Sequence, residues 1–403
     1  MNKLLQILNS NLYALSLYAR QIAGTFILFL IARYLTVYDY GLFTSYKAIA
    51  AFILILANMG FESYILVSAQ NDVKKVRLKI VLFMLNAFVI ILLTLLCIPF
   101  TLLENKLIFV LILLRTFFDG TFFALILPYF QSSRKLTDIS KINIVYAICI
   151  TLIATISYIF KLSLIKFLLL NIFLGLFNFI QCSYYSKIPY WSSLKKISKI
   201  FKYIDKKILS YMLINICYIL YIQTPSLFVS TYLDKEQAAL FFSAYTIANI
   251  IMLLIGAQTQ KAMPEFIDVK YADANKLIKK ECLKVFTCTF TIFLFFIIAG
   301  KFILKLLYSQ DYYINAYLAL LIFSMGNICY GIGKIYVTFI MAKGQTSTIW
   351  KMQIEAIIIC VVTLLLFHKF GIYAATLAYL LSATHIGIRY VIKTKQLLKQ
   401  HNK

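Results

Sequence analysis

The sequence predicts an all-α polytopic membrane protein with about twelve transmembrane helices. Of its 403 residues, 62% are hydrophobic and only 14% are charged, whereas a soluble chain would be roughly 45–50% apolar. The mean hydropathy is +0.85. Apolar stretches recur along the whole chain, and most of them approach the roughly 20 residues that a helix needs to cross a bilayer core.

Short polar segments separate twelve predicted spans. Two boundaries between consecutive spans are short. At 160–164 only Lys161 and Lys166 interrupt the apolar sequence, and at 368–371 the chain must make a tight turn. In chain order the spans are 12–35, 42–69, 80–103, 107–130, 142–160, 164–185, 208–232, 238–260, 283–304, 314–341, 352–368 and 371–392.

The first two spans form a hairpin whose corner, 36–41, is polar. Each contains ionisable residues well inside its apolar stretch: Arg20, and then Lys47 and Glu62. A charge at that depth costs roughly 3 kcal/mol or more unless it faces a bundle interior or a wet cavity. The hairpin is therefore predicted to form one wall of a polar cavity.

The same corner recurs in the second half of the chain, which predicts an internal repeat. Six identities occur at one constant offset, and the offset is close to half the chain. Repeats of this kind are typical of secondary transporters, in which the substrate site lies between the repeats. We expect both corners to lie on the outer face. The identities are Tyr34, Leu35, Leu42, Phe43, Ser45 and Ile49 with Tyr232, Leu233, Leu240, Phe241, Ser243 and Ile247.

The charges of the loops predict the topology. The formal net charge is +25, and Lys and Arg gather in every second loop and at both termini. Cytoplasmic loops collect these residues, so both termini are predicted to be cytoplasmic. In a soluble protein such a charge would suggest nucleic acid, but the membrane interpretation accounts for it and no nucleic acid partner is expected.

A basic segment at 187–207 divides the chain into an N-terminal lobe, 1–186, and a C-terminal lobe, 208–403, of six spans each. Apolar residues recur in this segment at helical spacing among lysines, which is typical of an amphipathic helix lying on the inner leaflet. A solvated linker is the compatible alternative. The apolar residues are Trp191, Ile197, Ile200, Phe201 and Ile204.

The residues that could carry catalysis or bind metal are sparse. The 8 cysteines are scattered singly and the 3 histidines are far apart, so neither disulfides nor a metal site is expected. No Walker motif, glycine-rich phosphate loop or buried carboxylate dyad occurs. The sequence therefore predicts a protein that is not an enzyme and has no cofactor.

Six ionisable residues inside the spans are candidates for function. The set leans positive, which suits an anionic substrate such as a phosphate or diphosphate headgroup. Four cations are predicted to bind substrate, and two carboxylates are predicted to serve coupling or structure. The cations are Arg20, Lys47, Arg115 and Lys334, and the carboxylates are Asp119 and Glu62.

Structural alternatives remain open for these residues. Arg115 and Asp119 are spaced i, i+4, so they share a helix face and can pair with each other. Lys47 and Lys334 are near enough to the interface to extend toward it. Glu62 could cap or bridge helices.

Four short motifs resemble those of a known family. Residues 33–43 resemble the corner after the first helix of polysaccharide-unit flippases, the O-antigen transporters of the multidrug/oligosaccharidyl-lipid/polysaccharide exporter superfamily. Residues 306–312 resemble the family's LLYG-x-x-Y stretch, 342–345 its A-x-G turn and 371–375 its GIxGAA pattern. Three positions depart from the glycine of the pattern: Ser309, Ala239 and Tyr373.

The resemblance implies two pseudo-symmetric six-helix lobes that face each other in a V-shaped central cavity. It also implies translocation of an undecaprenyl-diphosphate-linked oligosaccharide, an O-antigen or capsular unit, across a bacterial inner membrane by alternating access. In such flippases basic residues on the first two helices line the cavity, and Arg20 and Lys47 occupy similar places here. Implied partners are the lipid-linked oligosaccharide, membrane lipid, a polysaccharide polymerase and glycosyltransferases.

Two other functions compete with this one. A drug or metabolite antiporter of the same superfamily commonly takes cationic substrates, so its cavity should carry net negative charge. A membrane-bound glycosyltransferase or polymerase would need a sizeable outer loop and paired carboxylates, and neither is visible in the sequence.

Overall fold

The computed structural model describes residues 2–58, 73–101, 103–121, 126–127, 129–130, 136–188 and 206–401. Within these ranges the chain forms helices joined by short turns, and no strand occurs. The prediction of an all-α fold is therefore confirmed.

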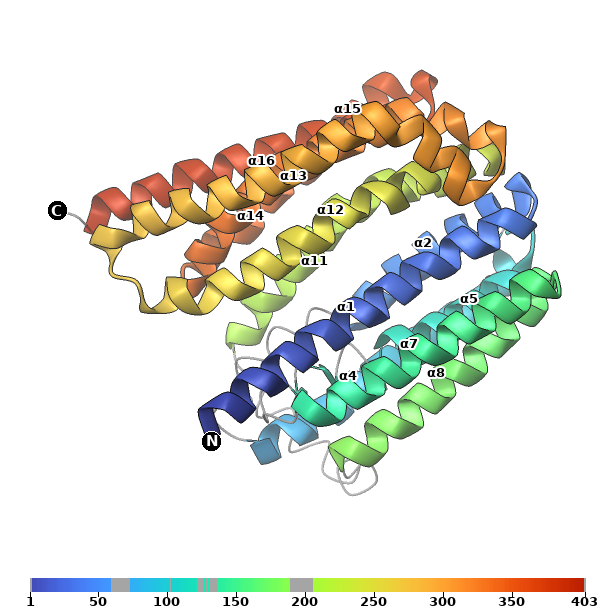
Figure 1. The fold of residues 1–403 in the computed structure, drawn as a ribbon, viewed down its shortest axis with the longest axis horizontal. Helices are drawn as coiled ribbons and strands as arrows, with labels where there is room; N and C mark the ends of the chain where they lie inside the picture. The colour runs from blue at the N-terminus through green and yellow to red at the C-terminus, as the bar shows by residue number, and fades with distance from the viewer. Residues whose placement is uncertain are drawn as a thin grey trace. The chain divides into compact units, whose positions relative to one another are not determined.

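The chain divides into two compact units, Met1–Ile216 and Cys217–Lys403, which are described separately. The first unit contains α1 (Asn2–Tyr34), α2 (Val37–Asn58), α4 (Val73–Cys97), η1 (Ile98–Phe100), α5 (Lys106–Thr116), η2 (Phe117–Thr121), α7 (Leu136–Ile159) and α8 (Leu164–Ser186). Figure 1 shows these helices side by side. In this unit α1 packs chiefly against α7, and α5 and η2 pack against α2 and α8.

The division between the units falls within α11, so the second unit begins inside that helix, at Cys217. Its helices are α11 (Lys206–Tyr232), α12 (Lys235–Asp268), α13 (Tyr271–Tyr308), η4 (Asp311–Ala316), α14 (Tyr317–Ala342), η5 (Thr346–Thr348), α15 (Ile349–Phe367), η6 (His368–Phe370) and α16 (Ile372–His401). The predicted amphipathic segment at 187–207 lies almost entirely outside the described residues, so its helix and the lobe boundaries stay predictions.

Ten helices in the described part of the chain are long and apolar enough to cross a membrane. They match ten of the twelve predicted spans. The other two, 42–69 and 107–130, coincide with α2 and with α5 and η2 but continue into residues outside the described ranges. The span boundary at 160–164 is confirmed, since α7 ends at Ile159 and α8 begins at Leu164. The tight turn predicted at 368–371 is confirmed as well, where η6 leads to Gly371 at φ +58°.

The repeated corners have the same local architecture. The helix before the corner ends at Tyr34 in one and at Tyr232 in the other, and in each case the next helix begins three residues later. A side-chain cap follows in both. The backbone N–H of Asp39 donates to Thr36 Oγ1 at 3.1 Å, as the N–H of Gln237 donates to Asp234 Oδ1 at 2.6 Å.

The capping residues occupy equivalent positions although their side chains differ. In each corner a side chain at the helix start satisfies an N–H three residues later, and the two side chains also bond to each other. Such reciprocal caps fix where a helix begins. The repeat thus preserves the corner's hydrogen bonding as well as its apolar sequence.

Glycines allow α14 and α16 of the second unit to approach closely. A Cβ at Gly333 would lie 2.6 Å from the Cα of Gly387, and a Cβ at Gly387 would lie 3.0 Å from the carbonyl oxygen of Cys329. Small residues at such crossings are the usual means of packing membrane helices, because lipid tails provide no hydrophobic drive for association.

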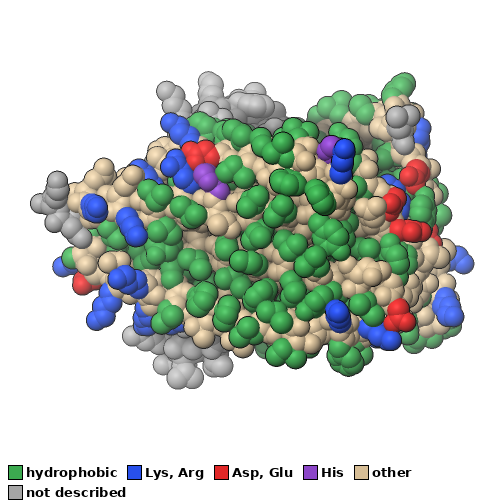
Figure 2. All heavy atoms as spheres, turned by 90° about the horizontal axis from the view of Figure 1, so that it is seen from above, with side chains coloured by type: hydrophobic (Ala, Val, Ile, Leu, Met, Phe, Trp, Pro, Cys, Tyr) green, Lys and Arg blue, Asp and Glu red, His purple; other side chains and the backbone are tan. Residues whose placement is uncertain are grey.

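The surface has the character of a membrane protein. Figure 2 shows hydrophobic side chains spread across the middle of one face, with most charged side chains toward its two ends. Large exposed apolar side chains occur on many described helices, among them Phe173, Ile298, Leu365 and Leu366. In a soluble protein a patch of this extent would be costly, whereas here it fits a lipid-facing surface.

Candidate functional site

The first unit contains a cavity of about 490 Å³ lined by both apolar and charged side chains. α1, α2, α5, η2 and α7 all contribute to its wall. The polar lining residues are Arg20, Gln21, Thr25, Lys47, Arg115, Thr116, Asp119 and Tyr146. Four of the six predicted site residues therefore share one cavity, although they lie on four different elements.

An ion pair between Arg20 and Asp119 occupies this cavity. Arg20 Nη2 lies 2.7 Å from Asp119 Oδ1, and the side chains are only 11% and 23% exposed. The hydroxyl of Tyr146 donates to the other carboxylate oxygen. The Arg20 guanidinium carbon also lies 3.8 Å from the centre of the Tyr146 ring, within the range of a cation–π contact. Each of the three side chains therefore contacts the other two.

Asp119 is positioned by a wide helical turn. It lies in η2, a π-helical segment that continues α5. Single π turns within helices frequently occur at functional sites. Gly175 of α8 permits this turn to pack closely, because a Cβ there would lie 3.0 Å from the Cβ of Phe118 and 3.5 Å from the backbone nitrogen of Asp119.

The pairing of Arg115 with Asp119, which the sequence left open as an alternative, is not found in the described part of the chain. Asp119 pairs with Arg20, and among the described residues no ion pair joins it to Arg115. The i, i+4 rule assumes an α-helix, but the π turn begins at Phe117 and changes the angle between the two side chains. The guanidinium of Arg115 instead lies 6.0 Å from the centre of the Phe167 ring.

Lys47 is the third cation of the cavity, and it projects from α2. The described lining therefore holds three cations against one carboxylate, a formal excess of two positive charges. Because the walls are largely apolar, these charges are screened less than they would be in water. The cavity is suited to attract an anion.

Lys334 is not among the lining residues of this cavity and belongs to α14 of the second unit. Its ammonium is 4.9 Å from the centre of the Tyr218 ring and 5.8 Å from that of Tyr330. The aromatic surroundings provide cation–π stabilisation within the span. Glu62 lies outside the described residues.

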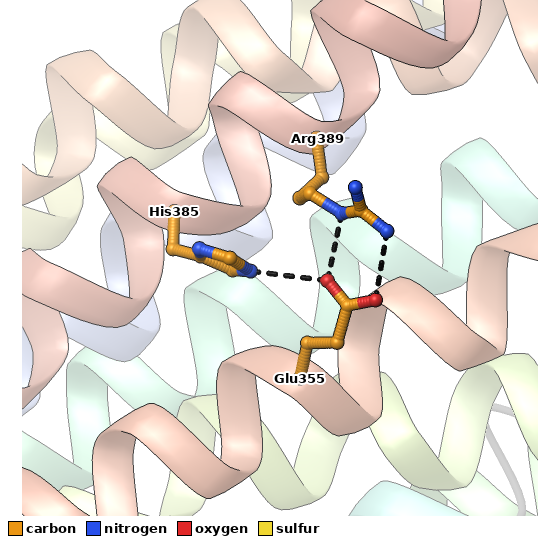
Figure 3. A network of polar contacts seen from close by, with 3 residues as sticks. All are labelled: Glu355, His385 and Arg389. Carbon is orange, nitrogen blue, oxygen red and sulfur yellow. Dashed lines mark hydrogen bonds and ion pairs between the residues drawn. The ribbon is translucent and has the colours of Figure 1, made fainter.

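Sequence reasoning missed two features. The first is Tyr146, whose only signal was a hydroxyl within the apolar span 142–160. The second is a network in the second unit that joins Glu355 to His385 and Arg389 (Figure 3). These three ionisable residues lie inside predicted spans, so the rule that identified Arg20 could have found them.

Residues 30–316 match the family described as polysaccharide biosynthesis protein. No curated protein sequence matches the chain.

Solved structures of membrane transporters resemble the whole fold. A lipid II flippase, MurJ, in an inward closed conformation, is 15% identical with a TM-score of 0.71, covering 95% of this chain and 87% of its own. A transporter of the MOP superfamily from Pyrococcus furiosus, whose binding pocket of reverse polarity suggests a different function, is 11% identical with a TM-score of 0.65, covering 99% and 96%.

A multidrug resistance transporter of the MATE family, also of the MOP superfamily, was solved in an inward-facing conformation. It is 12% identical with a TM-score of 0.61, covering 98% of this chain and 95% of its own. At such identities these three similarities show a shared fold.

Proposed function

We propose that this chain, which belongs to the family of polysaccharide biosynthesis proteins, is a flippase for a lipid-linked oligosaccharide. It would translocate an undecaprenyl-diphosphate-linked repeat unit from the cytoplasmic to the outer leaflet by alternating access. The family match and the fold shared with a lipid II flippase support this proposal.

The observation that carries the proposal is the positive cavity of the first unit. A carrier lipid with a diphosphate needs forked donors and point charges in a poorly hydrated space. Arg20 and Arg115 offer guanidinium groups, which bind phosphate oxygens in pairs, and Lys47 adds a compact ammonium. Binding that is shared among several cations can be strong and still allow release.

In this proposal the Asp119 carboxylate competes with the substrate for the guanidinium of Arg20. The carboxylate pairs with Arg20, which avoids an unpaired charge within the membrane. An entering diphosphate would take over the guanidinium while Tyr146 keeps its hydrogen bond to Asp119. When the substrate leaves, the carboxylate reclaims Arg20, so the cavity returns to its resting arrangement.

The orientation and location of the protein are part of the same proposal. The basic loops favour cytoplasmic termini in a bacterial inner membrane, and both repeated corners would then lie on the outer face. A polysaccharide polymerase and glycosyltransferases would be its partners. Cysteine labelling should find 195–207 and the C-terminal tail accessible from the cytoplasm, and labelling of either from outside would overturn the orientation.

Export of surface polysaccharide tests the function. Arg20→Ala should abolish export while the amount of inserted protein stays normal. Arg20→Lys should keep part of the activity, because the charge survives without the fork. Arg115→Gln is the sharper variant, since it removes a cavity cation that has no ion pair among the residues that the structure describes, and it should reduce export strongly. Lys166→Gln, at an exposed position outside the cavity, is the matched control and should export like the parent.

The proposal fails if Arg20→Ala and Arg115→Gln, each inserted at the parental level, export polysaccharide at the parental rate. Loss of insertion by Arg20→Ala alone would not decide the matter, because that change leaves the partly buried Asp119 without its cation. The Arg115→Gln result then decides.

A drug or metabolite antiporter is the second candidate, favoured by the fold shared with a multidrug resistance transporter. Exporters of cationic drugs should present net negative charge, and the described cavity presents the opposite. Drug resistance that depends on Asp119 and not on Arg20 would support this alternative.

A further inference from the structure

The ionic network of the second unit lies on its apolar surface. Arg389 forms a fork with Glu355, in which Nε lies 2.7 Å from Oε2 and Nη2 lies 2.8 Å from Oε1. His385 Nε2 lies 3.1 Å from Oε2. Figure 3 shows Glu355 on α15 facing the other two side chains on α16.

The charged side chains of this network and the neighbouring apolar side chains are exposed on the same surface. The side chains of Glu355 and Arg389 are 38% and 41% exposed. Four exposed isoleucines flank them on the same two helices: Ile354, Ile358, Ile388 and Ile392. On spanning helices an exposed isoleucine faces lipid, so the network borders the acyl region. Charges are rare there and usually mark a function.

The depth of the network places it near a headgroup layer. α15 has 19 residues, a length of about 28 Å that nearly matches the hydrocarbon core. Glu355 lies six residues after the start of α15, about 9 Å along it. Trp350, one residue after that start, is of the type that anchors helices at the interface. Long basic side chains near this end can therefore reach phosphate groups.

The local charge is complementary to an anion. Glu355 neutralises Arg389, but Lys351 lies four residues before Glu355 on α15, and Lys393 lies four residues after Arg389 on α16. Residues at that spacing share a helix face. The surface thus holds three cations against one carboxylate. Figure 3 also shows that the remaining guanidinium nitrogen of Arg389 points away from Glu355.

We propose that the junction of α15 and α16 binds an anionic phospholipid of the bilayer. Its phosphate lies among Arg389, Lys351 and Lys393, and its acyl chains cover the flanking isoleucines. The bound lipid joins the two helices of the second unit at their basic end. The residues of this site all belong to the second unit, and the proposal does not depend on the proposed transport activity.

Thermal unfolding of the purified full chain in detergent tests the site, together with native mass spectrometry of bound lipid. Phosphatidylglycerol should bind and raise the Tm by several degrees, while phosphatidylcholine should do neither. Lys351→Gln/Lys393→Gln leaves the Glu355 network intact and should weaken phosphatidylglycerol binding about tenfold or more, since each lysine near an anionic headgroup contributes severalfold. The matched control Lys276→Gln/Lys279→Gln, on exposed positions of α13, should respond like the parent.

Several results would overturn the proposal. Equal stabilisation by phosphatidylcholine would show that charge is not recognised. The same shift from inorganic phosphate alone would show that a soluble anion, rather than a lipid, is bound. A parental response of the Lys351→Gln/Lys393→Gln variant would place the lipid elsewhere. Arg389→Gln serves as a second probe and should lose phosphatidylglycerol binding at least as strongly.

Discussion

Arg20 and Asp119 are 99 residues apart in the sequence and form an ion pair of 2.7 Å inside the first unit. The contact joins α1 to the π-helical turn that ends α5. Each side chain relieves the other's cost of lying in a poorly hydrated place, and Tyr146 shares the carboxylate. The pair therefore links the packing of the unit to the charge of its cavity.

Changes at Asp119 and Tyr146 should shift anion affinity in opposite directions. Asp119→Asn removes the competitor for Arg20, so binding of undecaprenyl diphosphate to purified protein should tighten about tenfold, the effect of roughly 1.4 kcal/mol. Export should slow, because release becomes harder. Tyr146→Phe leaves the carboxylate more dependent on Arg20, so binding should weaken.

The binding assay contradicts the competitor role if Asp119→Asn weakens binding, or if Tyr146→Phe and Asp119→Asn change it in the same direction. Thr25→Ala is a suitable control. Its side chain lines the cavity but its hydroxyl bonds to the backbone of its own helix, so affinity should hardly change.

A double-mutant cycle should distinguish the two possible partners of Asp119. Arg20→Ala/Asp119→Ala should be milder than the sum of its single changes, with a coupling of roughly 1–3 kcal/mol in unfolding free energy, because each single change leaves a partly buried charge without its ion-pair partner. The Arg115→Ala/Asp119→Ala cycle should give a clearly smaller coupling. A larger coupling for Arg115 than for Arg20 would show that the ion pair is assigned wrongly.

Hydropathy predicted the spans because the length of an apolar stretch is set by the bilayer, which is the same for every helix. The positions of Arg20 and Lys47 in one cavity also followed, since a buried charge must face something polar. The partner of Arg20 could not be predicted. Helical spacing relates residues only within a helix, and the π turn around Asp119 has no signature in the sequence. Tyr146 was hidden for the same reason, because its role depends on contacts between helices.

The crossing of α14 and α16 should not tolerate side chains at its glycines. Gly333→Val would place its Cβ 2.6 Å from the Cα of Gly387, so the helices must separate. Overpacking of this kind typically costs about 1–3 kcal/mol, and the Tm should fall by several degrees. Gly256→Val on α12 is the matched control, because a Cβ there meets nothing within 4 Å. Equal destabilisation by both variants would show that close approach is not the cause.

Replacing Ser309 by glycine, the residue from which it departs in the LLYG-x-x-Y pattern, should stabilise the protein. Ser309 ends α13 with φ +58°, in the left-handed region, and its N–H donates to the carbonyl of Lys305 at 2.8 Å. A residue with a Cβ pays about 1–2 kcal/mol for this conformation, and glycine does not. Ser309→Gly should therefore raise the free energy of unfolding by about 1 kcal/mol, and Ser309→Val should lower it, as measured by chemical or thermal unfolding in detergent.

Ser163→Gly is the control, since Ser163 precedes α8 with an ordinary φ of −57° and gains nothing from the change. A loss of stability on Ser309→Gly would mean that the serine side chain contributes more than its backbone conformation costs.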